Sequence, residues 1–97
     1  MNTLDVIASK LDADDIAALR RIVKPDGTLR RTAPDWRKDP AAWATWQGIR
    51  TALGWHGEGA TAKLIMLDEP YRAMWDRVSG AALAARRMLH KARSTLD

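Results

Sequence analysis

The sequence contains no cysteine and no phenylalanine, and only two of its 97 residues are histidines. Without cysteine, the chain can form no disulfide, no zinc–thiolate site and no thiol nucleophile. No apolar run approaches the roughly 18 residues that a membrane-spanning helix needs. The N-terminal segment "MNTLDVIASK" also lacks the basic start and apolar stretch of a signal peptide. We therefore expect a cytoplasmic protein that binds no metal, contacts no membrane and is stabilised by packing.

The residues that are present predict one small helical domain over 1–97. A chain of this length has room for a single core, and apolar residues recur at helical spacing along most of it. The segment 61–67 is short and apolar, so it fits either a helix or a buried strand, and we assign it to a short helix. The expected fold class is mainly all-α, a compact bundle of about four to five helices with a long C-terminal helix.

Capping and turn residues divide the N-terminal half of the chain. Asp12 is the expected N-cap of a helix, and we assign Asp14 and Asp15 to its first turn, where acids complement the helix dipole. A Pro-Asp-Gly turn makes a minor hairpin near residues 22–30 a candidate. The rest of 24–39 is expected to be a loop, and a loop this long in a small domain indicates either a function or order that the sequence does not reveal.

The third helix is expected to begin at Asp39, an N-cap followed by proline, and to stop at Gly54, a typical residue beyond a helix end. It should carry a bulky stripe and, on the opposite side, a stripe of small residues. Such a helix is expected to lie between two neighbours as the central element. The bulky stripe comprises Ala42, Trp43, Trp46, Ile49 and Leu53, and the small stripe comprises Ala44, Gly48 and Ala52.

The last helix is expected to run from a cap at Asp68 to Leu96, with one apolar side throughout. The middle of that side is rich in alanine, which should let it approach the tryptophan-bearing third helix closely. The same alanine-rich face is a candidate surface for pairing with a second copy in a homodimer.

The pattern G-x-G-x-x-A at residues 57–62 matches part of a dinucleotide-binding fingerprint. That fingerprint needs a strand before its glycines, whereas these glycines follow a predicted helix, so we interpret them as a connector. His56 and Glu58 could form an acid/base pair, but a solvent-exposed loop explains them more simply. With no other catalytic constellation, we predict a non-enzymatic protein without a cofactor.

Basic residues are the strongest functional signal. The net charge is +4, from 16 bases against 12 acids, and no acid occurs between Arg77 and Leu96. The bases there lie opposite the apolar side, as in a surface that meets phosphates, although any amphipathic helix has a charged outer face. A basic loop also carries a tryptophan that could stack on an unpaired base. The candidate nucleic-acid or partner-binding residues are Arg30, Arg31, Trp36, Arg37, Lys38, Arg86, Arg87, His90, Lys91 and Arg93.

Two functions follow from this surface. The first is nucleic-acid binding, DNA in particular, in a small regulator that uses the C-terminal helix and the basic loop. The second is a protein-binding adaptor or inhibitor, of the kind that phages and mobile elements encode, acting on a larger machine. Surplus tryptophan and arginine favour it, because both are enriched in interface hot spots. Trp43 and Trp46 are expected in the core, whereas Trp36 and Trp55, on connectors, are expected to be more exposed.

Overall fold

The part of the chain that the structure describes contains five helices, joined by turns and loops. The computed structural model describes the backbone of residues 3–54 and 60–96, and the side chains of residues 3–54 and 62–89. No strand occurs within these ranges, so the all-α class is confirmed, as are the long C-terminal helix and the short helix within 60–66. The helices are α1 Thr3–Ala8, α2 Ala13–Ile22, α3 Pro40–Ala52, α4 Ala60–Met66 and α5 Glu69–Leu96.

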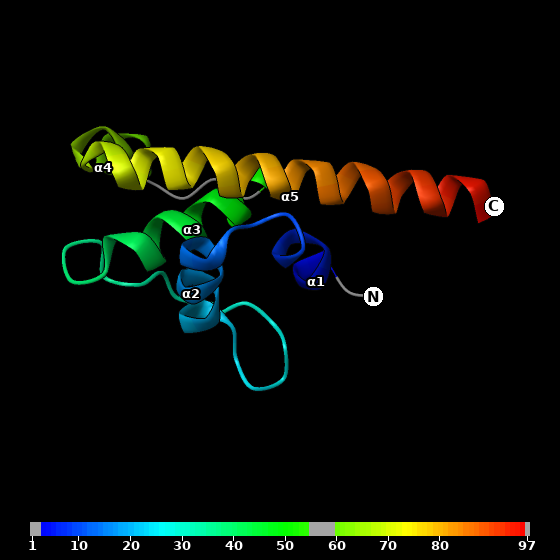
Figure 1. The fold of residues 1–97 in the computed structure, drawn as a ribbon, viewed down its shortest axis with the longest axis horizontal. Coiled ribbons are helices and arrows are strands. Elements are labelled where there is room, and N and C mark those ends of the chain that lie inside the picture. Colours follow the sequence, from blue (N-terminus) through cyan, green and yellow to red (C-terminus); the bar gives the residue numbers. More distant parts are fainter. Residues whose placement is uncertain (1–2, 55–59, 97) are drawn as a thin grey trace.

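α5 sets the length of the molecule. Its 28 residues at 1.5 Å each give a helix of about 42 Å, and the longest extent of the Cα trace is 44 Å. Figure 1 shows α5 running along the other helices, with α4 at its N-terminal end and its last turns projecting past α1. None of the helices in the described ranges is both long and apolar enough to cross a bilayer.

The predicted capping residues bound α2 and α3. The Asp12 carboxylate accepts a hydrogen bond from the backbone N–H of Asp15 at 3.0 Å. The Asp39 carboxylate accepts one from the N–H of Ala42 at 3.2 Å. Beyond α3, Gly54 has a φ of 95°, a left-handed conformation that glycine adopts without a Cβ clash. The expected starts of both helices and the end of α3 are thus confirmed.

The minor hairpin is present at residues 22–30. Val23 and Leu29 form an isolated antiparallel bridge, and Gly27 takes a φ of 84° in the turn between them. The hairpin lies against the core, since Val23 and Leu29 are both half-buried and pack on the main apolar cluster. Packing therefore supports a pairing that would be marginal on its own.

α3 is the central element, with α2 on one side and α5 on the other. Every residue from 42 to 49 is buried, which confirms both the predicted sandwich and the core position of Trp43 and Trp46. On the small face of α3, a Cβ added at Gly48 would lie only 3.2 Å from the carbonyl oxygen of Trp75 in α5. Glycine at this position is therefore what allows the two helices to approach so closely.

The alanine-rich face of α5 is covered by the chain itself. Ala81, Ala82 and Ala85 are buried in the same core cluster as Val6 and Ile7 of α1. Small side chains on α5 leave room for α1 to pack against it. The sequence suggested this alanine-rich face as a surface for homodimer formation. Because its three alanines are buried inside the molecule, a homodimer would have to use a different surface.

Replacing Gly48 with leucine is expected to lower the free energy of unfolding by about 1–3 kcal/mol, because the new side chain overpacks the contact between α3 and α5. Gly80 in α5 is the matched control, since a Cβ there meets no atom within 4 Å. Gly80→Leu should raise the free energy of unfolding by about 0.5 kcal/mol through helix propensity. Urea unfolding measures both variants, and equal effects at the two positions would contradict the close approach.

Candidate nucleic-acid interface

The basic segment, residues 30–38, presents four exposed cationic side chains: Arg30, Arg31, Arg37 and Lys38. Its first residue is fixed to α3. The carbonyl oxygen of Arg30 accepts a hydrogen bond from Nε1 of Trp46 at 2.8 Å and another from Nη2 of Arg50 at 2.9 Å. The guanidinium of Arg50 also lies 5.1 Å from the centre of the Trp46 ring. Two residues of α3 therefore fix the backbone position of Arg30, while the Arg30 side chain remains exposed.

The acids near the basic segment are engaged with the backbone. The Asp35 carboxylate accepts a hydrogen bond from the N–H of Arg37 at 2.9 Å, and the Asp35 carbonyl accepts from Asp39 N–H at 2.9 Å. The bond from Arg37 holds the pKa of Asp35 below its usual value. Asp35 thus stays ionised while it shapes the turn, and it makes no ion pair with the four cations of the segment among the described residues.

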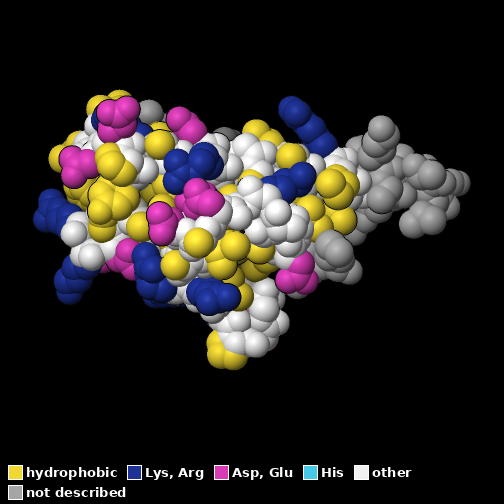
Figure 2. All heavy atoms as spheres, in the orientation of Figure 1, with side chains coloured by type: hydrophobic (Ala, Val, Ile, Leu, Met, Phe, Trp, Pro, Cys, Tyr) yellow, Lys and Arg dark blue, Asp and Glu magenta, His cyan; other side chains and the backbone are white. Residues whose placement is uncertain are grey.

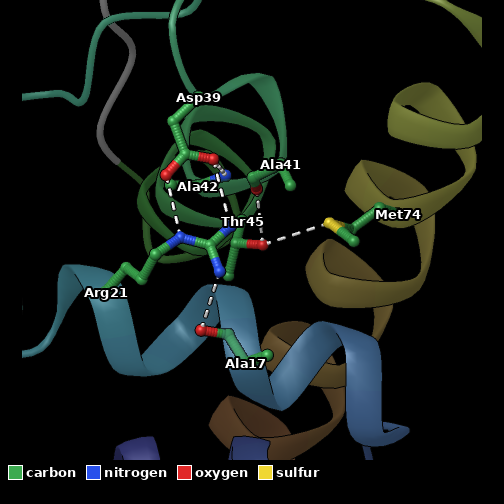
Figure 3. A network of polar contacts seen from close by, with 7 residues as sticks. All are labelled: Ala17, Arg21, Asp39, Ala41, Ala42, Thr45 and Met74. Carbon is green, nitrogen blue, oxygen red and sulfur yellow. Dashed lines mark hydrogen bonds and ion pairs between the residues drawn. The ribbon is translucent and has the colours of Figure 1, made fainter.

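Asp39 closes the segment and is paired with α2 (Figure 3). Arg21 donates to its two carboxylate oxygens, from Nε at 2.8 Å and from Nη2 at 3.0 Å. This bidentate pair, together with the N–H of Ala42, holds the pKa of Asp39 below its ordinary value. Deeper in the same network, the Thr45 hydroxyl donates to the carbonyl oxygen of Ala41 at 2.9 Å and lies 3.4 Å from the Met74 sulfur. One carboxylate therefore caps α3, anchors α2 and ends the basic segment.

Trp36 is less available than the sequence indicated. Its side chain is half-buried and packs on a second apolar cluster built around Trp43, Ala44 and Leu67. The Arg37 guanidinium lies 5.3 Å from the centre of its ring, a cation–π distance. A nucleobase could stack on Trp36 only by displacing a favourable contact. The physical reason is that α4 and the start of α5 supply apolar partners that the loop sequence alone does not reveal.

Arg77, the first base of the acid-free run, is held by α2 and does not belong to the basic surface. Its guanidinium donates to the Asp15 carboxylate from Nε at 3.1 Å and from Nη2 at 3.0 Å, and this bond raises the pKa of Arg77. Asp15 is in the first turn of α2, as predicted, but it is only 1% exposed. A carboxylate buried to this degree needs a charged partner, and α5 supplies it.

Two bases of the C-terminal helix are described on the surface. Nη1 of Arg86 donates to the carbonyl oxygen of Ala52 at 3.3 Å, which places it on the last turn of α3. Arg87 is exposed and has no hydrogen-bond or ion-pair partner within the described ranges. The side chains of the other three candidates, His90, Lys91 and Arg93, lie outside the described residues.

α3 connects the two basic regions. Figure 1 places residues 35–39 at the end of the molecule where α5 begins, and the end of α5 lies opposite. Arg86 meets α3 at its last turn, so the cations are distributed over the length of a 13-residue helix, about 20 Å. Figure 2 shows Lys and Arg side chains at several separate places on one face, with acidic side chains between them. The distance between the basic segment and Arg86 suits an extended polyanion better than a single phosphate.

Arg50 has a role in this interface that the sequence did not suggest. It is half-buried, and its bond to Arg30 fixes the start of the basic segment. The available signal was its position four residues after Trp46, since side chains at that spacing share one face of a helix. The tryptophan was assigned to the core, but the cation beside it was not connected with the loop.

The described residues contain no candidate metal site. In the described part of the chain, no three His, Cys, Asp or Glu side chains lie where they could hold a metal ion together. Trp55, His56 and Glu58 lie outside the described residues, as do Gly57 and Gly59.

Comparisons of the chain with protein-family models, with curated proteins and with solved structures gave no match. A function must therefore be inferred from the chemistry of the chain's own surface.

Arg77→Met should lower the free energy of unfolding by about 2–3 kcal/mol, because it leaves the buried Asp15 carboxylate without a cation. Asp15→Asn should cost less, about 1 kcal/mol, since the Arg77 side chain is 47% exposed and water can solvate it. Urea unfolding at neutral pH compares the two variants. If Arg77→Met is no less stable than Asp15→Asn, the carboxylate is not buried as described.

Proposed function

We propose that this chain is a non-enzymatic nucleic-acid-binding protein, with DNA as the preferred ligand and regulation as its role. The observation that carries the proposal is the basic segment. Four cations are exposed there, while the two adjacent acids, Asp35 and Asp39, are engaged with backbone N–H groups and Arg21. Arg21 neutralises Asp39, whereas Asp35 stays ionised without an ion pair to the four cations. Four bases against one acid leave residues 30–38 with a net charge of +3. Arg86 and Arg87 contribute a second contact, which His90, Lys91 and Arg93 would extend.

The segment is also fixed before any ligand binds. Arg30 is tied to α3 through its carbonyl oxygen, and Asp39 caps the start of the same helix. Arg37 is restrained by its contact with the Trp36 ring. Because these groups are already ordered, binding costs less conformational entropy than it would in a free loop.

The expected contacts are to phosphates. Half-buried Trp36, covered by Arg37, is poorly placed to stack on bases, so discrimination between sequences should be weak. Cations distributed over about 20 Å correspond to roughly six nucleotide steps of 3.4 Å along one strand. A short stretch of duplex or single strand that reaches from the basic segment to Arg86 and Arg87 fits this spacing.

A protein partner is the second candidate, because apolar side chains lie beside the second basic region. Leu83 is one helical turn from Arg86 and Arg87 and is 39% exposed, and Leu53, which follows Ala52, is 42% exposed. A mixed apolar and basic surface fits an acidic amphipathic segment of another protein. In this alternative the chain is an adaptor or an inhibitor of a larger machine.

Neutralising the basic segment tests the first function. Arg37→Gln with Lys38→Gln should weaken binding to a labelled DNA duplex about 10-fold or more at low salt. It should also reduce the slope of log K against log salt by about 2, because each phosphate contact contributes about 0.9. Fluorescence anisotropy across a salt series measures both quantities, on material freed of nucleic acid as judged by its absorbance ratio at 260 and 280 nm.

Lys10→Glu is the control for this experiment. It changes the net charge by the same two units at an exposed position between α1 and α2, so it should leave the salt slope nearly unchanged. Equal loss in the two variants would mean that net charge, and not the basic segment, governs binding. A protein partner that stays bound after nuclease treatment and is unaffected by the Gln pair would support the second candidate instead.

A further inference from the structure

α4 has apolar side chains on both its inner and its outer side. Leu64 points into the molecule and packs, with Leu67, on the cluster that contains Trp36. On the other side Ile65 and Met66 are each 68% exposed, and Ala62, one turn before Met66, is exposed as well. A surface helix normally turns polar residues to solvent. The outer side of α4 therefore has the composition of a contact surface.

Charged residues of both signs surround this apolar surface. Lys63 lies on α4, and Asp68 and Glu69 follow it directly; none of the three has an ion-pair partner within the described ranges. Arg72 donates from Nη1 to the carbonyl oxygen of Ile65 at 3.2 Å, so its guanidinium sits at the end of α4. Two bases and two acids thus border the apolar centre, and their charges cancel.

We propose that this surface, Ala62–Met66 with Lys63, Asp68, Glu69 and Arg72 at its border, pairs with the same surface of a second copy. A two-fold interface brings each patch against itself in reversed orientation. With the two α4 helices antiparallel, Lys63 of one copy approaches Asp68 and Glu69 of the other, while Ile65 and Met66 of both copies pack at the centre. The chain carries a net charge of +4, but the local balance removes the repulsion that would otherwise oppose self-association.

This charge pattern favours a second copy over a membrane surface or a nucleic acid. A membrane surface or a nucleic acid would favour a border with an excess of bases, and this border has none. The pairing would also matter for ligand binding, since α4 packs on the cluster that includes Trp36, next to Arg37. Two copies joined through α4 would carry two basic segments in one particle.

Molar mass as a function of concentration tests the proposal, by light scattering on nuclease-treated protein without any ligand. The wild-type mass should rise from 10.8 kDa toward twice that value between micromolar and millimolar concentration, as expected for an interface of modest area. Ile65→Glu with Met66→Glu should remain monomeric. The control pair is Leu83→Glu with Met88→Glu, which changes two exposed apolar residues elsewhere and should still dimerise. Far-UV circular dichroism checks that both variants remain helical.

A wild-type mass that stays at one copy up to millimolar concentration overturns the proposal, as does a dimer that survives the change at Ile65 and Met66. Two charge-reversed variants test the border separately. One carries Asp68→Lys with Glu69→Lys, the other carries Lys63→Glu with Arg72→Glu, and each should fail to self-associate. An equimolar mixture of the two should form heterodimers, and a mixture that stays monomeric contradicts the pairing. Because these measurements contain no nucleic acid, the absence of a dimer would not bear on the proposed nucleic-acid binding, which the salt dependence of DNA binding tests separately.

Discussion

The close approach of α3 and α5 at Gly48 determines where everything else in the molecule can lie. With no side chain at this position, the backbone of α5 at Trp75 comes close enough that even a methyl group would meet it at 3.2 Å. The contact has a cost, since Nε1 of Trp75 is buried without an acceptor in the described part of the chain. An unsatisfied donor of this kind costs about 1–3 kcal/mol, and the packing of α3 between its neighbours has to outweigh it.

Arginine divides into two groups on this scaffold. Several guanidiniums serve the fold, and each donates to an acid or a carbonyl oxygen of the chain itself. Others, with Lys38, stay exposed and unpaired among the described residues, because the nearby acids accept bonds from backbone N–H groups or from Arg21. The number of exposed, unpaired cations therefore indicates ligand binding better than the net charge of the whole chain does. The arginines engaged by the fold are Arg21, Arg50, Arg72 and Arg77. Arg86 stands in both groups, because it bonds to the carbonyl oxygen of Ala52 and is still exposed.

Local signals predicted the helices well, because caps and helix ends are encoded by a few neighbouring residues. Asp12, Asp39 and Gly54 each stand where the backbone needs an acceptor or a left-handed residue. The pairing of Asp15 with Arg77 was not predictable in this way, because 62 positions separate them and each has an adequate local explanation. The same limit applies to Trp36, whose apolar partners come from α4 and α5.

The candidate site was predicted only in part for the same reason. Periodicity predicted the exposure of Arg86 and Arg87, but not that Arg86 would bond to Ala52 at the end of α3. Nor did it show that α4, correctly expected as a short helix, would expose Ile65 and Met66. Exposure of a short apolar segment depends on how much surface its neighbours cover, which is a property of the assembled fold.

If both basic regions depend on α3 for their position, the backbone hydrogen bonds of α3 should be the most protected from hydrogen exchange in the molecule. Native-state hydrogen exchange measures this directly, residue by residue. The amides of residues 43–49 are predicted to exchange only through global unfolding, with the same free energy that urea denaturation gives. Exchange of these amides through a local opening of lower free energy than that of α5 would contradict the account, because the support of the basic segment would then be the weaker part of the molecule.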